Sequence, residues 1–170
     1  MSLFEQKLPA GLQYIPNYIT EEKQQELITK IDEQPWLTDL KRRVQHYGYK
    51  YDYKARKITP ELKIDPVPEW LQVLPNYDQV IINEYQQGQG ISSHIDCIPC
   101  FSNTICSLSL LSPCEMVFKN GNQKISIILE SLSLLILRGD ARYEWEHEIP
   151  SRKSNIKSRR VSITFRAVIL

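Results

Sequence analysis

The chain has 170 residues, of which 42% are hydrophobic and 24% charged, and these values are ordinary for one soluble globular domain with a core of its own. No apolar run is long enough to span a membrane, and the start of the chain has no apolar core of signal-peptide length. We therefore expect a cytoplasmic protein, or a nuclear one if the source is eukaryotic. The net charge of +1 points to no partner by itself, so the distribution of charge has to be examined.

The first half of the chain contains its only long helical pattern. Residues 12–19 predict a short strand or an extended lead-in, and Thr20 predicts the cap of the helix that follows. Leu27 and Ile31 give that helix an apolar stripe, and Pro35 ends it. We expect this helix to support one side of the fold.

The stretch after the helix is rich in tyrosine. Every second residue from Tyr47 to Tyr53 is a tyrosine, which predicts a strand with its rings on one face. A hairpin that uses tyrosine only for its β propensity is the alternative. Proline then punctuates residues 60–75, which leave room for a short helix at 69–73.

The second half is nearly all strand. One helix followed by many short strands is typical of a sandwich or jelly roll with helical support on one side. The predicted strands are residues 104–111, 132–137, 143–149 and 160–169, with a hairpin at 116–129 whose turn is Asn120-Gly121.

Residues 83–96, between the two halves, read Asn-Glu-Tyr-Gln-Gln-Gly-Gln-Gly-Ile-Ser-Ser-His-Ile-Asp. Side chains two apart in an extended segment lie on one face, so His94 and Asp96 point the same way. Together with a second histidine they would form the 2-His-1-carboxylate site of non-haem Fe(II) oxygenases. A chance pair on a solvated loop is the alternative for so short a motif.

The four cysteines, Cys97, Cys100, Cys106 and Cys114, fall within one short stretch. Reduced thiols suit a cytosolic protein. Cys97-x-x-Cys100 could be half of a zinc site, but zinc ribbons normally repeat the short spacing, and Cys106 and Cys114 do not.

Basic residues are concentrated in two segments. Residues 41–57 hold seven lysines and arginines and one acid, Asp52, and residues 151–166 hold six and no acid. Such asymmetry predicts an anionic partner.

The last strand, residues 160–166, alternates between two kinds of side chain. Val161, Ile163 and Phe165 face one way, while the opposite face carries two arginines and two small hydroxyl residues. Because the planar guanidinium pairs with a carboxylate through two bonds, this face predicts a slot for a dicarboxylate. An edge strand with solvated arginines is the alternative.

Taken in chain order, Asn83-x-Tyr85, His94-x-Asp96, His147 and Arg160-x5-Arg166 resemble the AlkB family of Fe(II)- and 2-oxoglutarate-dependent dioxygenases. The likeness runs from about residue 42 to the C-terminus. It is greatest to the AlkB-type domain of the tRNA wobble-uridine hydroxylases, at residues 42–49, 88–91, 107–110 and 139–147. The resemblance implies a mainly β (α+β) fold, a double-stranded β-helix (jelly roll) with an N-terminal supporting helix, and one AlkB-like dioxygenase domain over residues 1–170.

The resemblance also implies the cofactors. His94, Asp96 and His147 would bind Fe(II), with 2-oxoglutarate and O2 as co-reactants. Arg160, helped by Tyr85 and Asn83, would pair with the far carboxylate of 2-oxoglutarate. Arg166 would meet the carboxylate near the metal, and Ser162 would line the same slot.

For the substrate, we expect oxidation of a nucleic-acid base in RNA, tRNA or single-stranded DNA, by a monomer that does not bind membranes. A non-catalytic RNA-binding jelly roll is one alternative, and the same oxygenase chemistry on a protein or small molecule is another. The residues that we expect to face the substrate are Arg42, Arg43, His46, Tyr47, Tyr49, Arg142 and Arg152.

Overall fold

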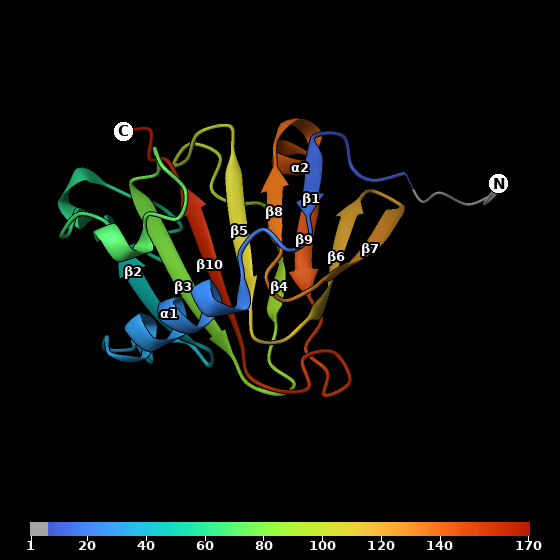
Figure 1. Ribbon diagram of the computed structural model, residues 1–170. Coiled ribbons are helices and arrows are strands. Elements are labelled where there is room, and N and C mark those ends of the chain that lie inside the picture. Colours follow the sequence, from blue (N-terminus) through green and yellow to red (C-terminus); the bar gives the residue numbers. More distant parts are fainter. Residues whose placement is uncertain (1–6) are drawn as a thin grey trace.

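The computed structural model describes residues 7–170, which form two antiparallel sheets with few helices (Figure 1). In spatial order the larger sheet contains β1 (Leu12–Ile15), β8 (Leu134–Leu137), β5 (Ile105–Leu110), β10 (Arg160–Arg166), β3 (Gln79–Tyr85) and β2 (Arg43–Tyr47). The smaller sheet contains β4 (Ile91–His94), β9 (Glu146–Ile149), β6 (Cys114–Asn120) and β7 (Gln123–Leu129). The helices are α1 (Glu21–Asp32) and α2 (Gly139–Tyr143), with 3-10 turns at Pro60–Leu62 and Glu69–Leu71.

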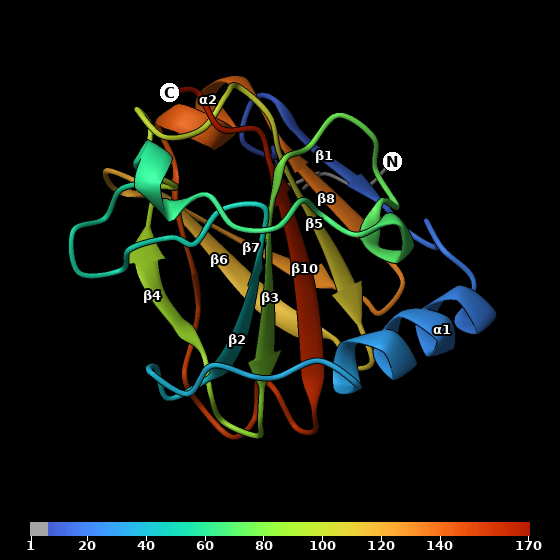
Figure 2. The ribbon, with the colours of Figure 1, turned by 90° about the vertical axis from the view of Figure 1, so that its left-hand side faces the viewer.

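The larger sheet lies between α1 and the smaller sheet (Figure 2). Its outer face packs on α1 through Leu27 and Ile31 of the helix. Its inner face shares a second apolar cluster with the smaller sheet, which contributes Phe118 and Leu129. These layers confirm the predicted mainly β jelly roll with an N-terminal supporting helix.

Helix α1 forms where its sequence predicts. The hydroxyl of Thr20 accepts a hydrogen bond from the backbone N–H of Lys23, which caps the first turn. Within residues 7–170, no helix is both long and apolar enough to cross a membrane. The expectation that the chain does not start with a signal peptide concerns mainly residues 1–6, which lie outside the described part.

Strand β10 divides its side chains between two environments, as its alternation predicts. Val161, Ile163 and Phe165 join the apolar cluster under α1. Ser162 faces the space between the sheets, where it is the register partner of both Asn83 on β3 and Ser109 on β5. The centre of the larger sheet therefore presents polar side chains to the interior.

The predicted tyrosine strand is shorter than expected. Strand β2 ends at Tyr47, because Gly48 has a φ of +77° and the chain turns there. Beyond the turn, Tyr49 pairs only through an isolated bridge with Lys63. The prediction of one strand through Tyr53 is wrong, since alternation cannot reveal a left-handed residue within the pattern.

Two other segments differ in detail from their predictions. Asn120 pairs with Gln123, so the two turn residues of the hairpin are Gly121 and Asn122 rather than Asn120 and Gly121. The predicted strand at 143–149 is shortened to β9, because the residues before it form the five-residue helix α2.

Two glycines with positive φ provide a matched test of the turn after β2. A Cβ added at Gly48 would overlap the carbonyl oxygen of Asp78, whereas one added at Gly121 would meet nothing within 4 Å. Gly121→Ala should cost about 1–2 kcal/mol from the left-handed backbone alone. Gly48→Ala should cost clearly more, because the backbone must also move. Equal losses of unfolding free energy in urea titrations would contradict this account.

Candidate active site

His94, Asp96 and His147 meet at one edge of the smaller sheet. His94 ends β4 and is the register partner of His147 on β9, so the ring centroids lie 4.5 Å apart. Asp96 follows two positions later, with Oδ1 3.3 Å from Nε2 of His94 and 3.6 Å from Nε2 of His147. One ligand atom of each residue lies within 4.8 Å of the others, close enough for all three to bind one metal ion.

The surroundings shift the pKa values of the two histidines in opposite directions. Nδ1–H of His94 donates to the carbonyl oxygen of Ser92 at 2.7 Å, which leaves Nε2 facing Asp96. Burial opposes a charge on His94, but the hydrogen bond and charge of Asp96 outweigh it and raise its pKa. Burial lowers the pKa of His147 to about 4, which keeps its imidazole neutral, as metal binding requires.

Asp96 is held ionised by its surroundings. Burial by itself would raise the pKa of its carboxyl, but the hydrogen bond with His94 and the charge of Arg166 hold it well below the usual range. Nη1 of Arg166 donates to Oδ2 of Asp96 at 2.9 Å, and Nε donates to Gln79 at 2.9 Å. The guanidinium also stacks 3.9 Å from the ring centroid of Phe101.

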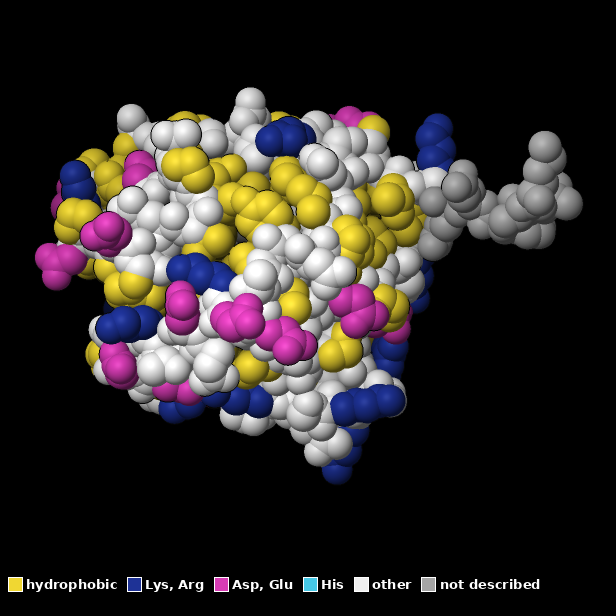
Figure 3. All heavy atoms as spheres, in the orientation of Figure 1, with side chains coloured by type: hydrophobic (Ala, Val, Ile, Leu, Met, Phe, Trp, Pro, Cys, Tyr) yellow, Lys and Arg dark blue, Asp and Glu magenta, His cyan; other side chains and the backbone are white. Residues whose placement is uncertain are grey.

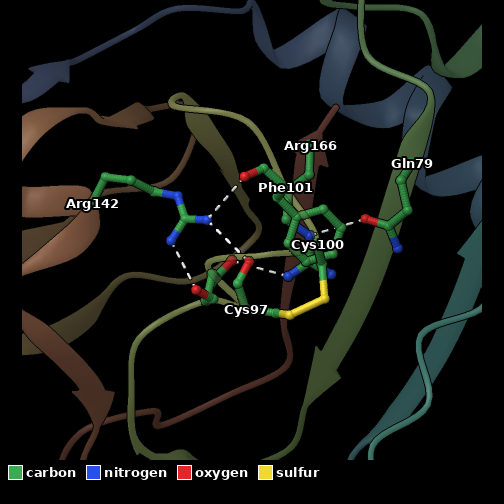
Figure 4. The surroundings of a disulfide bond; sticks show 7 residues. Gln79, Cys97, Cys100, Phe101, Arg142 and Arg166 are labelled. Carbon is green, nitrogen blue, oxygen red and sulfur yellow. Dashed lines mark hydrogen bonds and ion pairs between the residues drawn. A yellow bond between two sulfur atoms is a disulfide. The ribbon is translucent and has the colours of Figure 1, made fainter. Parts of the chain in front are cut away.

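Arg142 holds the turn that follows Asp96 (Figure 4). Its side chain comes from α2, and the residue is only 2% exposed. The guanidinium donates to the backbone carbonyl oxygens of Asp96 at 2.8 Å, Cys97 at 3.1 Å, Ser102 at 3.3 Å and Phe101 at 3.4 Å. The backbone at the carboxylate is therefore fixed from a second element.

Arg160 lies deep in the same interior. It is 1% exposed, and its Nη2 donates to the hydroxyl of Ser109 at 2.8 Å. Its guanidinium lies 5.4 Å from the ring centroid of Tyr85. The Nε and Nη1 donors are buried without a partner among the described residues. Since buried donors are normally satisfied, this arginine is set to receive an anion.

A cavity of about 330 Å³ connects these groups. Arg160 and Ser162 line it on the side of the larger sheet, and the His94–Asp96–His147 triad lines it on the other. Its remaining wall carries aromatic and basic side chains, namely Arg42, Tyr51, Tyr53 and Arg56. An arginine with two unpaired donor atoms and a triad of metal-ligand residue types therefore share one chamber.

A family profile described as "2OG-Fe(II) oxygenase superfamily" matches residues 11–166. A protein of Arabidopsis thaliana, "Alkylated DNA repair protein ALKBH8 homolog", is 34% identical over an alignment of 201 positions. The alignment covers 93% of this chain and 58% of that protein. The chain belongs to this superfamily as an AlkB-type domain.

Other AlkB-type proteins are similar over most of the chain. The Macaca fascicularis protein "tRNA (carboxymethyluridine(34)-5-O)-methyltransferase ALKBH8" is 33% identical over 87% of this chain and 25% of its own length. The solved structure of OsALKBH1 superposes with a TM-score of 0.76 at 17% identity, covering 95% of this chain and 99% of that one. The chain thus spans little more than half of one curated relative and a quarter of the other.

Two of the predicted substrate-facing arginines form contacts inside the domain. Arg42 lines the cavity and donates through Nε to Oδ1 of Asn83 at 2.8 Å. Arg43 makes a two-bond ion pair with the buried carboxylate of Glu84, which also pairs with Arg159. The structure brings Arg42 to the AlkB-type cavity, but it engages Arg43 in an internal network.

The three aromatic residues that we expected to face the substrate, His46, Tyr47 and Tyr49, have different surroundings. Tyr47 packs against Trp70 on the outer side of the larger sheet, and its hydroxyl donates to Gln45. His46 accepts a weak hydrogen bond from the backbone of Tyr51, and burial lowers its pKa to about 4. Tyr49 packs on the inner apolar cluster. None of these three lines the cavity, whose tyrosines are instead Tyr51, Tyr53 and Tyr85.

Arg142 and Arg152 lie away from the cavity. Arg142 is buried against the turn after Asp96, as described above. Arg152 pairs with Glu115 on the surface. Spacing alone could not show these roles, because the partners of both arginines lie in distant parts of the chain.

The cysteines do not form a zinc site. Cys97 and Cys100 form a disulfide, so the expectation of reduced thiols is wrong for this pair. Cys106 lies in the cluster under α1 and Cys114 in the cluster between the sheets, both as free thiols. The larger sheet separates them, which excludes a shared ion.

Changing Asp96 to Asn tests the triad with almost no change in volume. The amide cannot supply the negative charge that a divalent cation and Arg166 require, so affinity for Mn(II) should fall at least about 100-fold. This exceeds the roughly 10–100-fold loss typical of residues that contact only the metal's ligands. Calorimetric titration of Mn(II) under anaerobic conditions measures this loss. Glu146→Gln, an exposed carboxylate change on β9 beside His147, is the control and should bind Mn(II) normally.

Proposed function

We propose that this domain is an Fe(II)- and 2-oxoglutarate-dependent dioxygenase that hydroxylates or oxidatively demethylates a base of a nucleic acid, releasing succinate and CO2. The observation that supports it best is the shared cavity. The His94–Asp96–His147 triad and Arg160, which has unsatisfied donors, line the same cavity, and cationic and aromatic side chains line another part of its wall.

The residues present fit both cofactors. The triad offers two imidazoles and one carboxylate on one side of an ion, which suits Fe(II) and leaves positions for other ligands. When bound, Fe(II) and 2-oxoglutarate would supply the activation of O2. The chain's task is to hold these ligands, to orient the substrate and to keep water out.

Arg160 is the proposed partner of the far carboxylate of 2-oxoglutarate. Its Nε and Nη1 have no partner among the described residues, and a carboxylate can take the two-bond pairing through either of them together with the second N–H of Nη2, whose first N–H donates to Ser109. Tyr85 packs beside it, and Ser162 and Asn83 line the path toward the triad. Arg166 already neutralises Asp96, so in our proposal it contributes positive charge near the metal-side carboxylate.

For the substrate, Tyr51 and Tyr53 are the proposed stacking wall. A base taken from its stack needs an aromatic ring or a guanidinium plane to lie against. The two rings contact each other edge to face at 5.1 Å, and Arg42 lies 6.0 Å from the ring centroid of Tyr53. This wall replaces His46, Tyr47 and Tyr49 in our proposal.

Phosphate binding is proposed for the two basic segments. Both touch the loop between β3 and β4, since Gln89 donates to the carbonyl of Lys41 and the backbone of Gly88 donates to that of Ile156. Figure 3 shows lysine and arginine side chains along the lower edge of the molecule. Acidic side chains lie above this edge, in the region where Figure 1 shows α1. Lys54, Lys57, Lys153 and Lys157 are exposed.

Truncating Arg160 tests the cosubstrate site. Removing one partner of a desolvated ion pair costs on the order of 3–5 kcal/mol. Arg160→Ala should therefore raise the 2-oxoglutarate concentration needed for half-maximal succinate release by roughly two to three decades. Arg160→Lys should recover only part, because an ammonium lacks the planar fork. Arg138→Ala, which removes an exposed arginine, should leave the requirement unchanged; an unchanged requirement in Arg160→Ala would refute the assignment.

The substrate is tested by binding and turnover with single-stranded RNA, tRNA and methylated DNA oligonucleotides. Each phosphate contact should contribute about 0.7 to the slope of log affinity against log salt on single strands. Replacing two contacting lysines by alanine should lower that slope by about 1.4 and reduce RNA-stimulated succinate release at moderate salt. The test variants are Lys54→Ala/Lys57→Ala and Lys153→Ala/Lys157→Ala, with Lys23→Ala/Lys30→Ala on α1 as the charge-matched control.

The outcomes separate the alternatives. Tight, salt-sensitive RNA binding without succinate release would favour a non-catalytic RNA-binding domain. Succinate release that no nucleic acid stimulates would favour a protein or small-molecule substrate. Equal effects of all three lysine pairs would show that net charge, rather than a defined face, controls binding.

A further inference from the structure

The disulfide between Cys97 and Cys100 lies against the proposed metal site (Figure 4). Cys97 directly follows Asp96 in the chain and lines the same cavity as His94 and His147. Cys100 is 3% exposed and belongs to the inner apolar cluster. One sulfur therefore borders the chamber where O2 would react, and the other lies behind it.

Hydrogen bonds hold this turn in addition to the disulfide. Arg142 donates to the carbonyl oxygens of Asp96, Cys97 and Phe101, and the N–H of Cys100 donates to the carbonyl of Cys97. The stabilisation from a disulfide increases with the length of the loop that it closes, and this one joins residues only three positions apart. A role as a structural staple therefore explains little.

We propose that Cys97 and Cys100 are a redox pair that reduces activated oxygen to water when 2-oxoglutarate is consumed with no substrate in the cavity. The inference rests on the 2-oxoglutarate turnover in the proposed function. It gives the domain a second activity, the oxidation of its own dithiol, and the disulfide is the product of that activity.

The reaction balances without another oxidant. One atom of O2 enters succinate as 2-oxoglutarate loses CO2, and the second atom remains at the site. Transfer of that atom to Cys97 converts its S–H to a sulfenic acid. The thiol of Cys100 then attacks the sulfenic sulfur, the S–S bond forms and water leaves. In sum, 2-oxoglutarate, O2 and two thiols give succinate, CO2, water and one disulfide.

The positions of the two sulfurs set the order of these steps. Cys97 is half-buried and lines the cavity, so it receives the oxygen atom, whereas Cys100 is shielded and acts as the resolving thiol. The Cα atoms lie 5.3 Å apart, within the range that a disulfide bridges. A small dithiol can reset the pair by thiol–disulfide exchange at Cys97.

The test uses the full chain, reduced and freed of reductant without oxygen. It is loaded with Fe(II) and 2-oxoglutarate, given limiting O2 and no other substrate, and then alkylated. Succinate is quantified, and peptide mass spectrometry counts the free thiol at each cysteine. We expect two thiols to be lost for each succinate formed in the first turnover, both from Cys97 and Cys100. When oxygen is supplied without 2-oxoglutarate, both cysteines should keep their free thiols and therefore be recovered alkylated.

Variants test the order of the steps. Cys100→Ser should stop at a sulfenic acid on Cys97 that a cyclic 1,3-diketone traps, whereas Cys97→Ser should leave Cys100 unmodified. Cys106→Ser, in the cluster under α1, is the matched control and should keep the ratio of two thiols per succinate.

The results distinguish this inference from the function on which it rests. If succinate forms but both cysteines are still recovered as alkylated thiols, the redox pair alone is overturned. The same holds if equal numbers of thiols are lost when 2-oxoglutarate is left out. Absence of succinate in this substrate-free assay would also overturn the redox pair, whereas the proposed function would fail only if none of the nucleic acids tested above released succinate.

Discussion

The buried contact between Arg166 and Asp96 organises the interior of this domain. A carboxylate buried to 8% exposure is costly unless it is paired, and Asp96 is paired with a guanidinium that is itself 7% exposed. Arg166 comes from the central strand of the larger sheet, whereas Asp96 follows β4 of the smaller one. The pair therefore joins the two sheets at the metal-binding residues. Removing either partner would leave a charge in a dry interior.

Much of the fold, and the placement of His94 and Asp96 on one face, could be predicted from short-range periodicity, whereas His147 was indicated only by the family resemblance. The alternation in residues 160–166 placed Arg160 and Ser162 opposite Val161 and Ile163 correctly, and the cap at Thr20 marked the start of α1. Failures occurred where long-range partners decide. The pairing of Arg43 with Glu84 and the burial of Arg142 against four carbonyl groups both depend on tertiary contacts that the local sequence does not reveal. Ser109 could have been anticipated from its place in the alternating strand at 104–111.

The number of basic residues in segments 41–57 and 151–166 overstates the positive charge that is free to bind a partner. Arg43 and Arg159 share the carboxylate of Glu84, and Arg159 also bonds Asp32 at the end of α1. Part of the positive charge near the β2 edge thus ties the supporting helix to the sheet. Apart from Arg42 and Arg56 at the cavity, the charge that remains for an outside anion is carried mainly by exposed lysines, which suit contacts with a phosphate backbone better than recognition of one fixed group.

The register of β4 and β9 has a consequence for folding. His94 and His147 face each other only because an irregularity between Ile91 and His94 shifts the pairing by one position. A slip of one residue turns every side chain of a strand to the opposite face. An ion that binds both imidazoles therefore binds the native register and not its neighbours. By mass action such an ion would stabilise the correctly paired sheet, so metal supply would become one of the conditions that govern how much of the chain is folded.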